Sequence, residues 1–194
     1  MIRLALLRHG HTAWNRQGRI QGRSDIPLDE DAKAHLARLA LPPEWQDCDL
    51  WSSPLQRAVE TAQIITGHPP KTDLALGEMN WGDWEGQEGI KLRADPQSGY
   101  RDIEDWGWNY RPPKGESPAD LSARLRPWVE TLRRDAFAVC HIGIMRVLMA
   151  QATGWDFTGP PPFQIKRNRL FVITIRDGKW SANDAPIRLP ERAS

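Results

Sequence analysis

Two histidines of this sequence follow short apolar segments in the same way. The apolar segment 2–7 leads into Arg8 and His9, and the apolar segment 136–140 leads into His141. Short continuous apolar runs are typical of strands buried on both faces of a parallel sheet. Ligands of an open α/β sheet bind beyond the carboxyl ends of its strands, so we expect both histidines to face one pocket.

Two arginines belong to the same predicted pocket. Arg8 precedes the first histidine, and Arg57 lies just past the first turn of a helix expected between Ser53, as its N-cap, and Gly67. The backbone N–H groups at the start of this helix, and of a helix expected after His141, favour an anion. Two arginines and two histidines fit a phosphoryl group, whose oxygens suit bidentate guanidinium contacts.

Five motifs occur in a fixed order over most of the chain. They are 7–15 (LRHGHTAWN), 21–28 (QGRSDIPL), 52–62 (SSPLQRAVETA), 77–86 (GEMNWGDWEG) and 141–146 (HIGIMR). In this order they resemble the histidine phosphatase superfamily, in its phosphoglycerate mutase-like branch. The resemblance implies one domain over residues 1–194, with the α/β fold of phosphoglycerate mutases.

The resemblance also implies roles for five residues. His9 would attack phosphorus and become phosphohistidine, Arg8, Arg57 and His141 would hold the phosphoryl oxygens, and Glu78 would be the proton donor. The chemistry suits these residue types, because a neutral imidazole is a nucleophile at pH 7 and two displacements are each easier than one. A carboxylic acid near the leaving oxygen can protonate it and then activate water.

Further substrate contacts are implied for Asn15 and for the backbone of Gln21 and Gly22. Two positions depart from the family pattern. His11 stands where glutamate or glutamine is usual, and Ile142 follows the second histidine where glycine is usual. Ile142 therefore places bulk beside the expected phosphate.

The resemblance favours a phosphatase over a mutase, because the extra basic and tyrosine-rich motifs of full-length mutases are missing. Segments 18–28 and 115–117 look most like the small branch of α-ribazole phosphatases and broad-specificity phosphatases. We expect a phosphomonoester hydrolase for a small organic phosphate, such as α-ribazole phosphate or a sugar phosphate. Mutase-type phosphoryl transfer is one alternative. A non-catalytic module that binds a phosphorylated ligand is another, suggested by His11 and Ile142.

A cysteine-based chemistry competes with the histidine one. The segment from Cys140 to Arg146 reads C-x5-R, similar to the phosphate loop of cysteine phosphatases, which would make Cys140 the nucleophile. This alternative leaves Arg8, His9 and Arg57 without a role. Among the acids, Glu85 competes with Glu78.

A metal site is a further alternative. His9 and His11 are the types of residue that bind zinc, but the adjacent Arg8 repels a cation and no carboxylate or histidine cluster completes a ligand set. We therefore expect neither a metal ion nor another cofactor.

The composition limits the partners. The chain has 194 residues and a formal net charge of +1, which does not provide the general field of a nucleic-acid or membrane-surface binder. No segment approaches the roughly 18 apolar residues of a membrane span. Two cysteines, Cys48 and Cys140, make no disulfide framework, so we expect a reducing cytoplasm. The expected partner is a small phosphomonoester, and the sequence does not specify an oligomeric state.

Strand and helix patterns alternate along the chain. Asp29 is expected to cap a helix that runs to about Ala40, and Ser117 to cap a second helix that Pro127 should kink. The remaining expected elements are strands 49–52 and 170–175, a hairpin turn at 177–178 and a helix over 144–153. This order predicts an α/β fold, with a mostly parallel sheet and helices on both faces.

Ten tryptophans are the unusual feature of the composition. Trp81, Trp84, Trp106 and Trp108 fall in one polar segment, 80–113, which contains glycine and proline. The family places a variable region here, so this segment is expected to be an insertion that covers the pocket and selects the leaving group. An equally supported interpretation is that Trp81, Trp84 and Trp106 close a satellite core.

Overall fold

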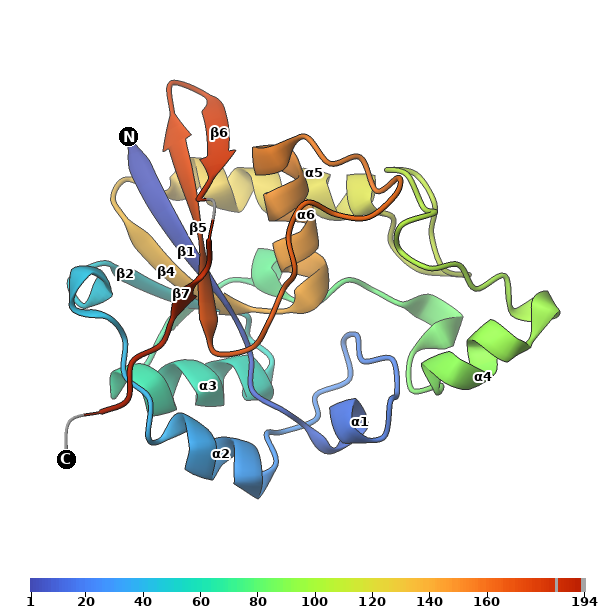
Figure 1. Cartoon of the computed structure of the whole chain (residues 1–194), viewed down its shortest axis with the longest axis horizontal. Helices are drawn as coiled ribbons and strands as arrows, with labels where there is room; N and C mark the ends of the chain where they lie inside the picture. Colours follow the sequence, from blue (N-terminus) through green and yellow to red (C-terminus); the bar gives the residue numbers. More distant parts are fainter. Residues whose placement is uncertain (184, 193–194) are drawn as a thin grey trace.

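One mixed sheet forms the centre of the computed structural model, which describes residues 1–183 and 185–192 (Figure 1). The strand order is β3-β2-β4-β1-β5-β6, and β7 pairs with β5. Strands β3, β2, β4 and β1 are parallel, whereas β5, β6 and β7 add an antiparallel edge. The strands are β1 (Ile2–Arg8), β2 (Asp49–Ser52), β3 (Lys71–Thr72), β4 (Ala136–Cys140), β5 (Arg169–Arg176), β6 (Lys179–Ala182) and β7 (Ile187–Arg188). The expected α/β fold is confirmed.

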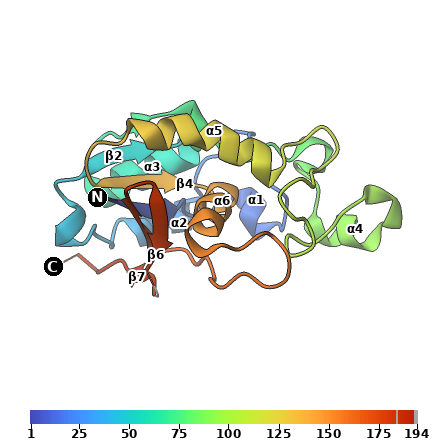
Figure 2. The ribbon, with the colours of Figure 1, turned by 90° about the horizontal axis from the view of Figure 1, so that it is seen from above.

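Helices cover both faces of this sheet, as Figure 2 shows from above. Helices α2 and α3 lie on one face and α5 and α6 on the other. The α-helices are α1 (Ala13–Arg16), α2 (Glu30–Leu36), α3 (Gln56–Thr66), α4 (Gly89–Ala94), α5 (Pro118–Thr131) and α6 (Ile142–Thr153). Short 3₁₀ helices are η1 (Pro43–Trp45), η2 (Leu74–Leu76), η3 (Gly82–Trp84) and η4 (Pro96–Ser98). In the part of the chain that the structure describes, no helix combines the length and apolar character needed to span a membrane.

The apolar run of β1 explains why this strand is central. Leu4 and Leu6 pack into the core under α5 and α6, while Ala5 and Leu7 pack into the core under α2 and α3. All four side chains are at most 1% exposed. Burying a leucine side chain contributes roughly 1.5–3 kcal/mol, so alternation into two cores fixes β1 on both faces.

Helix starts agree with the sequence signals at two places. The Asp29 side chain accepts a hydrogen bond from the Ala32 amide, and the Ser117 hydroxyl accepts one from the Asp120 amide. The helix after Asp29 is shorter than expected and ends at Leu36, and α5 continues as a helix through Pro127.

The helix after His141 begins earlier than expected, at Ile142 instead of residue 144. His141 is its N-cap, with extended backbone angles (φ −124°, ψ 166°). The N-terminal end of α6 therefore begins directly at this histidine, which brings the positive end of the helix dipole to it.

The tryptophan-rich segment is tied into the main core. Trp84 and Trp106 are 1% and 5% exposed, and their ring centroids lie 6.1 Å apart. Both belong to the same cluster as Leu4 and Leu6, so these two tryptophans pack as core and do not form a separate satellite. Trp81 and Trp108 are only partly buried against that cluster.

Candidate active site

The register of β1 and β4 brings the two histidines together. Arg8 is paired with Cys140 at the carboxyl ends of these parallel neighbours, so the next residue of each chain segment is a histidine. The His9 amide donates to the Cys140 carbonyl at 3.0 Å, and the imidazole centroids of His9 and His141 lie 5.0 Å apart. Both side chains are buried, at 3% and 0% exposure.

The tautomer of His9 follows from its hydrogen bond. Nδ1 lies 2.7 Å from the Gly10 carbonyl oxygen. A carbonyl only accepts, so Nδ1 carries the proton and Nε2 keeps its lone pair. Burial, together with the charges of His141, Arg57 and Arg8, lowers the pKa of His9 well below its ordinary value. At neutral pH the ring is therefore an uncharged nucleophile with Nε2 available.

Arg57 is held in place by carbonyl groups of the loop after α1. Its Nη1 donates to the Ser24 carbonyl at 2.8 Å and its Nη2 to the Gly22 carbonyl at 2.6 Å. The side chain is fully buried, and its Nε has no partner among the described residues. The Nε of Arg8 is likewise buried and without a partner there. Two guanidinium groups thus retain donors for an anion.

Glu78 is the buried carboxyl group of this site, at 2% exposure. Its Oε1 accepts from the Met79 amide at 2.8 Å and from the Gly143 amide at 3.1 Å. Burial raises the pKa of Glu78 above its ordinary value, although these amides and the charge of Arg57 oppose the shift. A raised pKa favours the protonated form of the carboxyl group, which is the form that a general acid requires.

Glycine allows a carboxylate to lie close to the backbone at two positions around these groups. A Cβ atom at residue 143 would lie 2.4 Å from Glu78 Oε1, and a Cβ atom at residue 22 would lie 2.5 Å from Glu85 Oε2. Each glycine therefore permits a carboxylate to approach the backbone. Glu85 also accepts a hydrogen bond from the Ser24 amide, next to the loop that holds Arg57.

The prediction that Ser53 caps α3 is wrong. The helix begins at Gln56, and Leu55 occupies the N-cap position without a side-chain cap. The Ser53 Oγ instead lies 2.7 Å from His141 Nε2, where both residues are fully buried. Ser53 is thus a residue of the site that the sequence reasoning missed, because its sequence context resembles an ordinary capping box.

Asn15 and Gln21 belong to a polar network beside His9. The Gln21 Oε1 accepts from Thr12 Oγ1 at 3.0 Å and from Asn15 Nδ2 at 3.1 Å, and its Nε2 is buried without a partner among the described residues. The neighbouring Gly22 carbonyl is occupied by Arg57.

Arg167, from the loop before β5, completes this network and was not foreseen. Its Nε donates to the His9 carbonyl at 3.1 Å and its Nη2 to Asn15 Oδ1 at 2.8 Å. Burial lowers its pKa to about 10. Lys166, Arg167 and Arg169 form a basic stretch that is the only sequence signal, and such stretches are usually solvated.

The two departures from the family pattern lie at the edge of the site. Ile142 is the first residue of α6 and is partly buried, as is His11. Burial and the charges of Arg167 and Arg16 lower the pKa of His11. Ile142, which the sequence places before the helix expected from residue 144, is thus the first residue of α6.

Cys140 is poorly suited to act as a nucleophile. It is the last residue of β4 and is fully buried. Burial raises the pKa of its thiol far above its ordinary value, and the charge of Glu78 adds to the shift. Since the thiolate is the reactive form, this environment opposes the cysteine chemistry.

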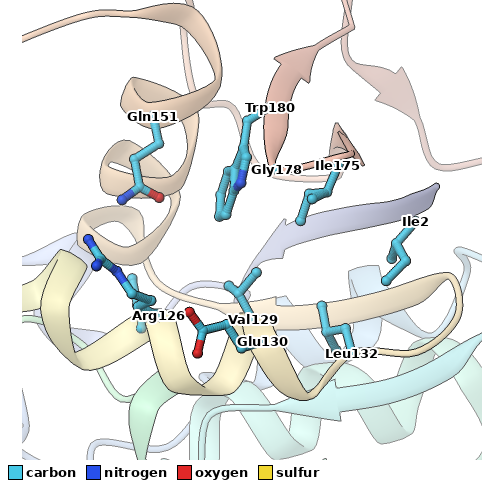
Figure 3. Close-up of a pocket in the computed structure, with 10 residues that line it drawn as sticks. Ile2, Arg126, Val129, Glu130, Leu132, Gln151, Ile175, Gly178 and Trp180 are labelled. Atoms are coloured by element: carbon cyan, nitrogen blue, oxygen red, sulfur yellow. The ribbon is translucent and has the colours of Figure 1, made fainter.

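A hollow lies at the opposite end of β1 from the histidines (Figure 3). It has a volume of about 640 Å³ and is lined by Ile2, Val129, Ile175 and Trp180, with Arg126 and Gln151 at its polar side. Ile2 and His9 are separated by the length of the strand, roughly 20 Å. The hollow is therefore separate from the buried histidines.

Comparisons with known proteins point to one family. A family model described as "Histidine phosphatase superfamily (branch 1)" matches residues 4–185. The chain is 32% identical to 6-phosphofructo-2-kinase/fructose-2,6-bisphosphatase 4 of Rattus norvegicus, over 75% of this chain and 31% of the relative. It is 36% identical to glucosyl-3-phosphoglycerate phosphatase of Mycobacterium tuberculosis, over 67% of this chain and 60% of the relative. The chain thus spans about a third of the first relative's length and about three fifths of the second's.

A solved structure agrees over nearly the whole chain. The structure of mycobacterial glucosyl-3-phosphoglycerate phosphatase in complex with VO3 superposes with a TM-score of 0.77 and 25% identity. The alignment covers 94% of this chain and 98% of that chain. The architecture described above is therefore shared with a phosphatase.

The buried histidines predict an acid-sensitive fold. Burial is also the main cause that lowers the pKa of His141 well below its ordinary value. Unfolded histidines bind protons near pH 6.5, whereas His9 and His141 resist protonation in the folded state, so the free energy of unfolding should fall as pH decreases below about 6.5. The raised pKa of Glu78 acts with the opposite sign at acidic pH. The histidine contribution is therefore measured as a difference between variants.

We expect the double variant His9→Gln/His141→Gln to lose less stability than the wild type between about pH 6.5 and pH 5. Urea denaturation in phosphate-free buffer at constant salt measures this slope. His68→Gln, at an exposed position, is the matched control and should keep the wild-type slope. An unchanged slope in the double variant would assign the acid sensitivity to other groups.

Proposed function

Because the chain belongs to the histidine phosphatase superfamily (branch 1), we propose that it hydrolyses small phosphomonoesters through a phosphohistidine on His9. The hydrogen bond from His9 Nδ1 to the Gly10 carbonyl carries this proposal, because it leaves the Nε2 lone pair free. The neighbouring donors of Arg8, Arg57 and His141 suit the phosphoryl oxygens.

The reaction requires two displacements. In the first, His9 Nε2 attacks phosphorus, the bond between phosphorus and the ester oxygen breaks, and Glu78 gives its proton to the leaving oxygen. In the second, water attacks phosphorus, the Glu78 carboxylate takes the proton of that water, and the bond from phosphorus to Nε2 breaks. Alcohol and inorganic phosphate leave, and His9 and Glu78 return to their starting states.

Charge stabilisation is the main contribution that the arginines would supply. The partly buried Arg8 and the fully buried Arg57 lie in surroundings with little water, and burial lowers the pKa of Arg8 to about 9. Donors fixed in such surroundings stabilise the shifting charge of the transition state more than donors in water do. Asn15 and the free Nε2 of Gln21 are proposed as substrate contacts beside them.

Segment 80–113 is proposed to cover the mouth of this site within a single domain. The Ile20 amide donates to the Gln87 carbonyl and the Gly86 amide to the Ile20 carbonyl, which attaches the segment to the loop of Gln21. Trp81 and Trp108 are the partly buried tryptophans that a leaving group could contact. We further propose a cytoplasmic location and no nucleic-acid partner, supported by the free thiols and the small net charge.

A substrate with a second negative group is favoured by the charges around the site. Arg146 and Arg167 add two partly buried guanidinium groups to the phosphoryl set, whereas Glu78 is the buried acid among them. Arg146 lies one helical turn after Ile142, and burial lowers its pKa. The names of the two relatives contain a bisphosphate and a phosphoglycerate, which both carry a second anionic group.

His9→Ala should abolish turnover and the acid-labile phosphoenzyme, because the remaining cations can bind phosphate but cannot form the covalent intermediate. Release of phosphate from a chromogenic phosphomonoester and trapping with ³²P-labelled substrate measure the two effects. Cys140→Ser is the matched control and should retain both. Labelling that survives His9→Ala and disappears in Cys140→Ser would assign the chemistry to the cysteine, and a wild type without any turnover would favour the binding module.

Glu78→Gln should slow alkyl phosphates much more than activated aryl phosphates, because only the poor leaving group needs a proton in the transition state. The ratio of kcat/KM for the two ester types in wild type and variant measures this effect. Glu85→Gln should leave that ratio near the wild-type value. An equal loss for both ester types in Glu78→Gln would remove Glu78 from the acid role.

Arg146→Met should lower kcat/KM for 3-phosphoglycerate by about 10- to 100-fold and change that for glycerol 3-phosphate little, because only the first substrate presents a carboxylate to the guanidinium. The exposed Arg126 offers the control Arg126→Met, which should affect neither substrate. Equal losses for both substrates would show that Arg146 does not distinguish the second anionic group. The same assay extends to sugar phosphates and α-ribazole phosphate.

A further inference from the structure

The Ser53 hydroxyl lies where three elements meet. Its residue follows the last residue of β2, and its amide donates to the Val139 carbonyl of β4 at 3.0 Å, two residues before His141. Its Oγ accepts a hydrogen bond from the Leu55 amide at 3.2 Å, just before α3. Backbone hydrogen bonds to Val139 and from Leu55 therefore hold Ser53 in place, and its hydroxyl lies next to the His141 ring.

The hydrogen bonds of this hydroxyl bear on the tautomer of His141. A serine hydroxyl has one proton and two lone pairs, and the Leu55 amide already uses one lone pair. His141 Nε2 lies 2.7 Å away, whereas His141 Nδ1 is buried with no partner within residues 1–183 and 185–192. If Ser53 donates to Nε2, the proton of the neutral ring is on Nδ1, as a free donor.

A phosphoryl group bound beside His9 would require the tautomer of His141 that carries its proton on Nδ1. The opposite tautomer would leave the Nδ1 lone pair buried without a donor, and a phosphoryl oxygen cannot hydrogen-bond to a lone pair. The geometry points to Ser53 as a positioning residue that fixes the His141 ring and holds its proton on Nδ1 for the phosphoryl group. The second lone pair of Oγ lets the contact persist when His141 is protonated at both nitrogens.

The effect of Ser53 on catalysis rests on the proposed phosphatase activity. The tautomer of His141 can be measured independently of that activity. The first measurement is therefore the ¹⁵N spectrum of the wild-type protein labelled at histidine, in phosphate-free buffer and with inorganic phosphate. We expect the His141 signals of a protonated Nδ1 and an unprotonated Nε2, assigned by comparison with His141→Gln. A wild-type ring protonated at Nε2 in the neutral state would overturn the inference.

The second measurement compares Ser53→Ala with Ser52→Ala. Both serines are fully buried and adjacent, but the Ser52 hydroxyl donates to the Ser53 carbonyl and does not contact a histidine. Ser53→Ala should lose the wild-type ¹⁵N pattern of His141 and reduce kcat/KM about 10-fold or more, whereas Ser52→Ala should keep the pattern. An unchanged pattern in Ser53→Ala would overturn the inference. A wild type that releases no phosphate but shows the expected pattern would contradict the proposed activity alone.

Discussion

The pairing of two parallel strands is the constraint on which the rest of the site depends. Arg8 and Cys140 are opposite one another at the ends of β1 and β4, so the following histidines must lie side by side. A shift of this pairing by one residue would move every side chain of β1 to the other face of the sheet. Leu4 and Leu6 would then face the core that now contains Ala5 and Leu7. The register of β1 and β4 therefore places His9 beside His141, with Arg8, the last residue of β1, directly before the first of them.

The site concentrates positive charge, and the backbone is arranged to tolerate it. Carbonyl groups of Gly22 and Ser24 solvate Arg57, and the His9 carbonyl accepts from Arg167. Burying a cation without such partners costs several kcal/mol, so these carbonyls replace lost water. Burial, together with the same positive surroundings, lowers the pKa of His9 and keeps the ring uncharged, which links the binding of an anion to the reactivity of the nucleophile.

The elements could be predicted from the sequence more completely than the contacts between distant residues. The strands before His9 and His141 and the caps at Asp29 and Ser117 follow local patterns, and the structure confirms them. The Ser53 prediction failed because a local capping signal competed with a buried histidine 88 positions away. Arg167 was missed for a related reason, because its role depends on the loop before β5 returning to the end of β1. Local sequence propensity contains no information about which distant segments of the chain come into contact.

Ile142, which follows the second histidine, does not occupy the position closest to Glu78. That position is residue 143. A Cβ atom at residue 143 would lie 2.4 Å from Glu78 Oε1 and would displace this carboxylate, and this chain has glycine there. Residue 142 is the first helical residue of α6 and is only partly buried, so its side chain has space outside the carboxylate contact. The Gly143 amide donates to Glu78 Oε1 at 3.1 Å, and the absence of a Cβ at 143 permits this close approach. The departure at 142 thus lies outside the carboxylate contact, and the position that the acid contacts has the glycine of the family pattern.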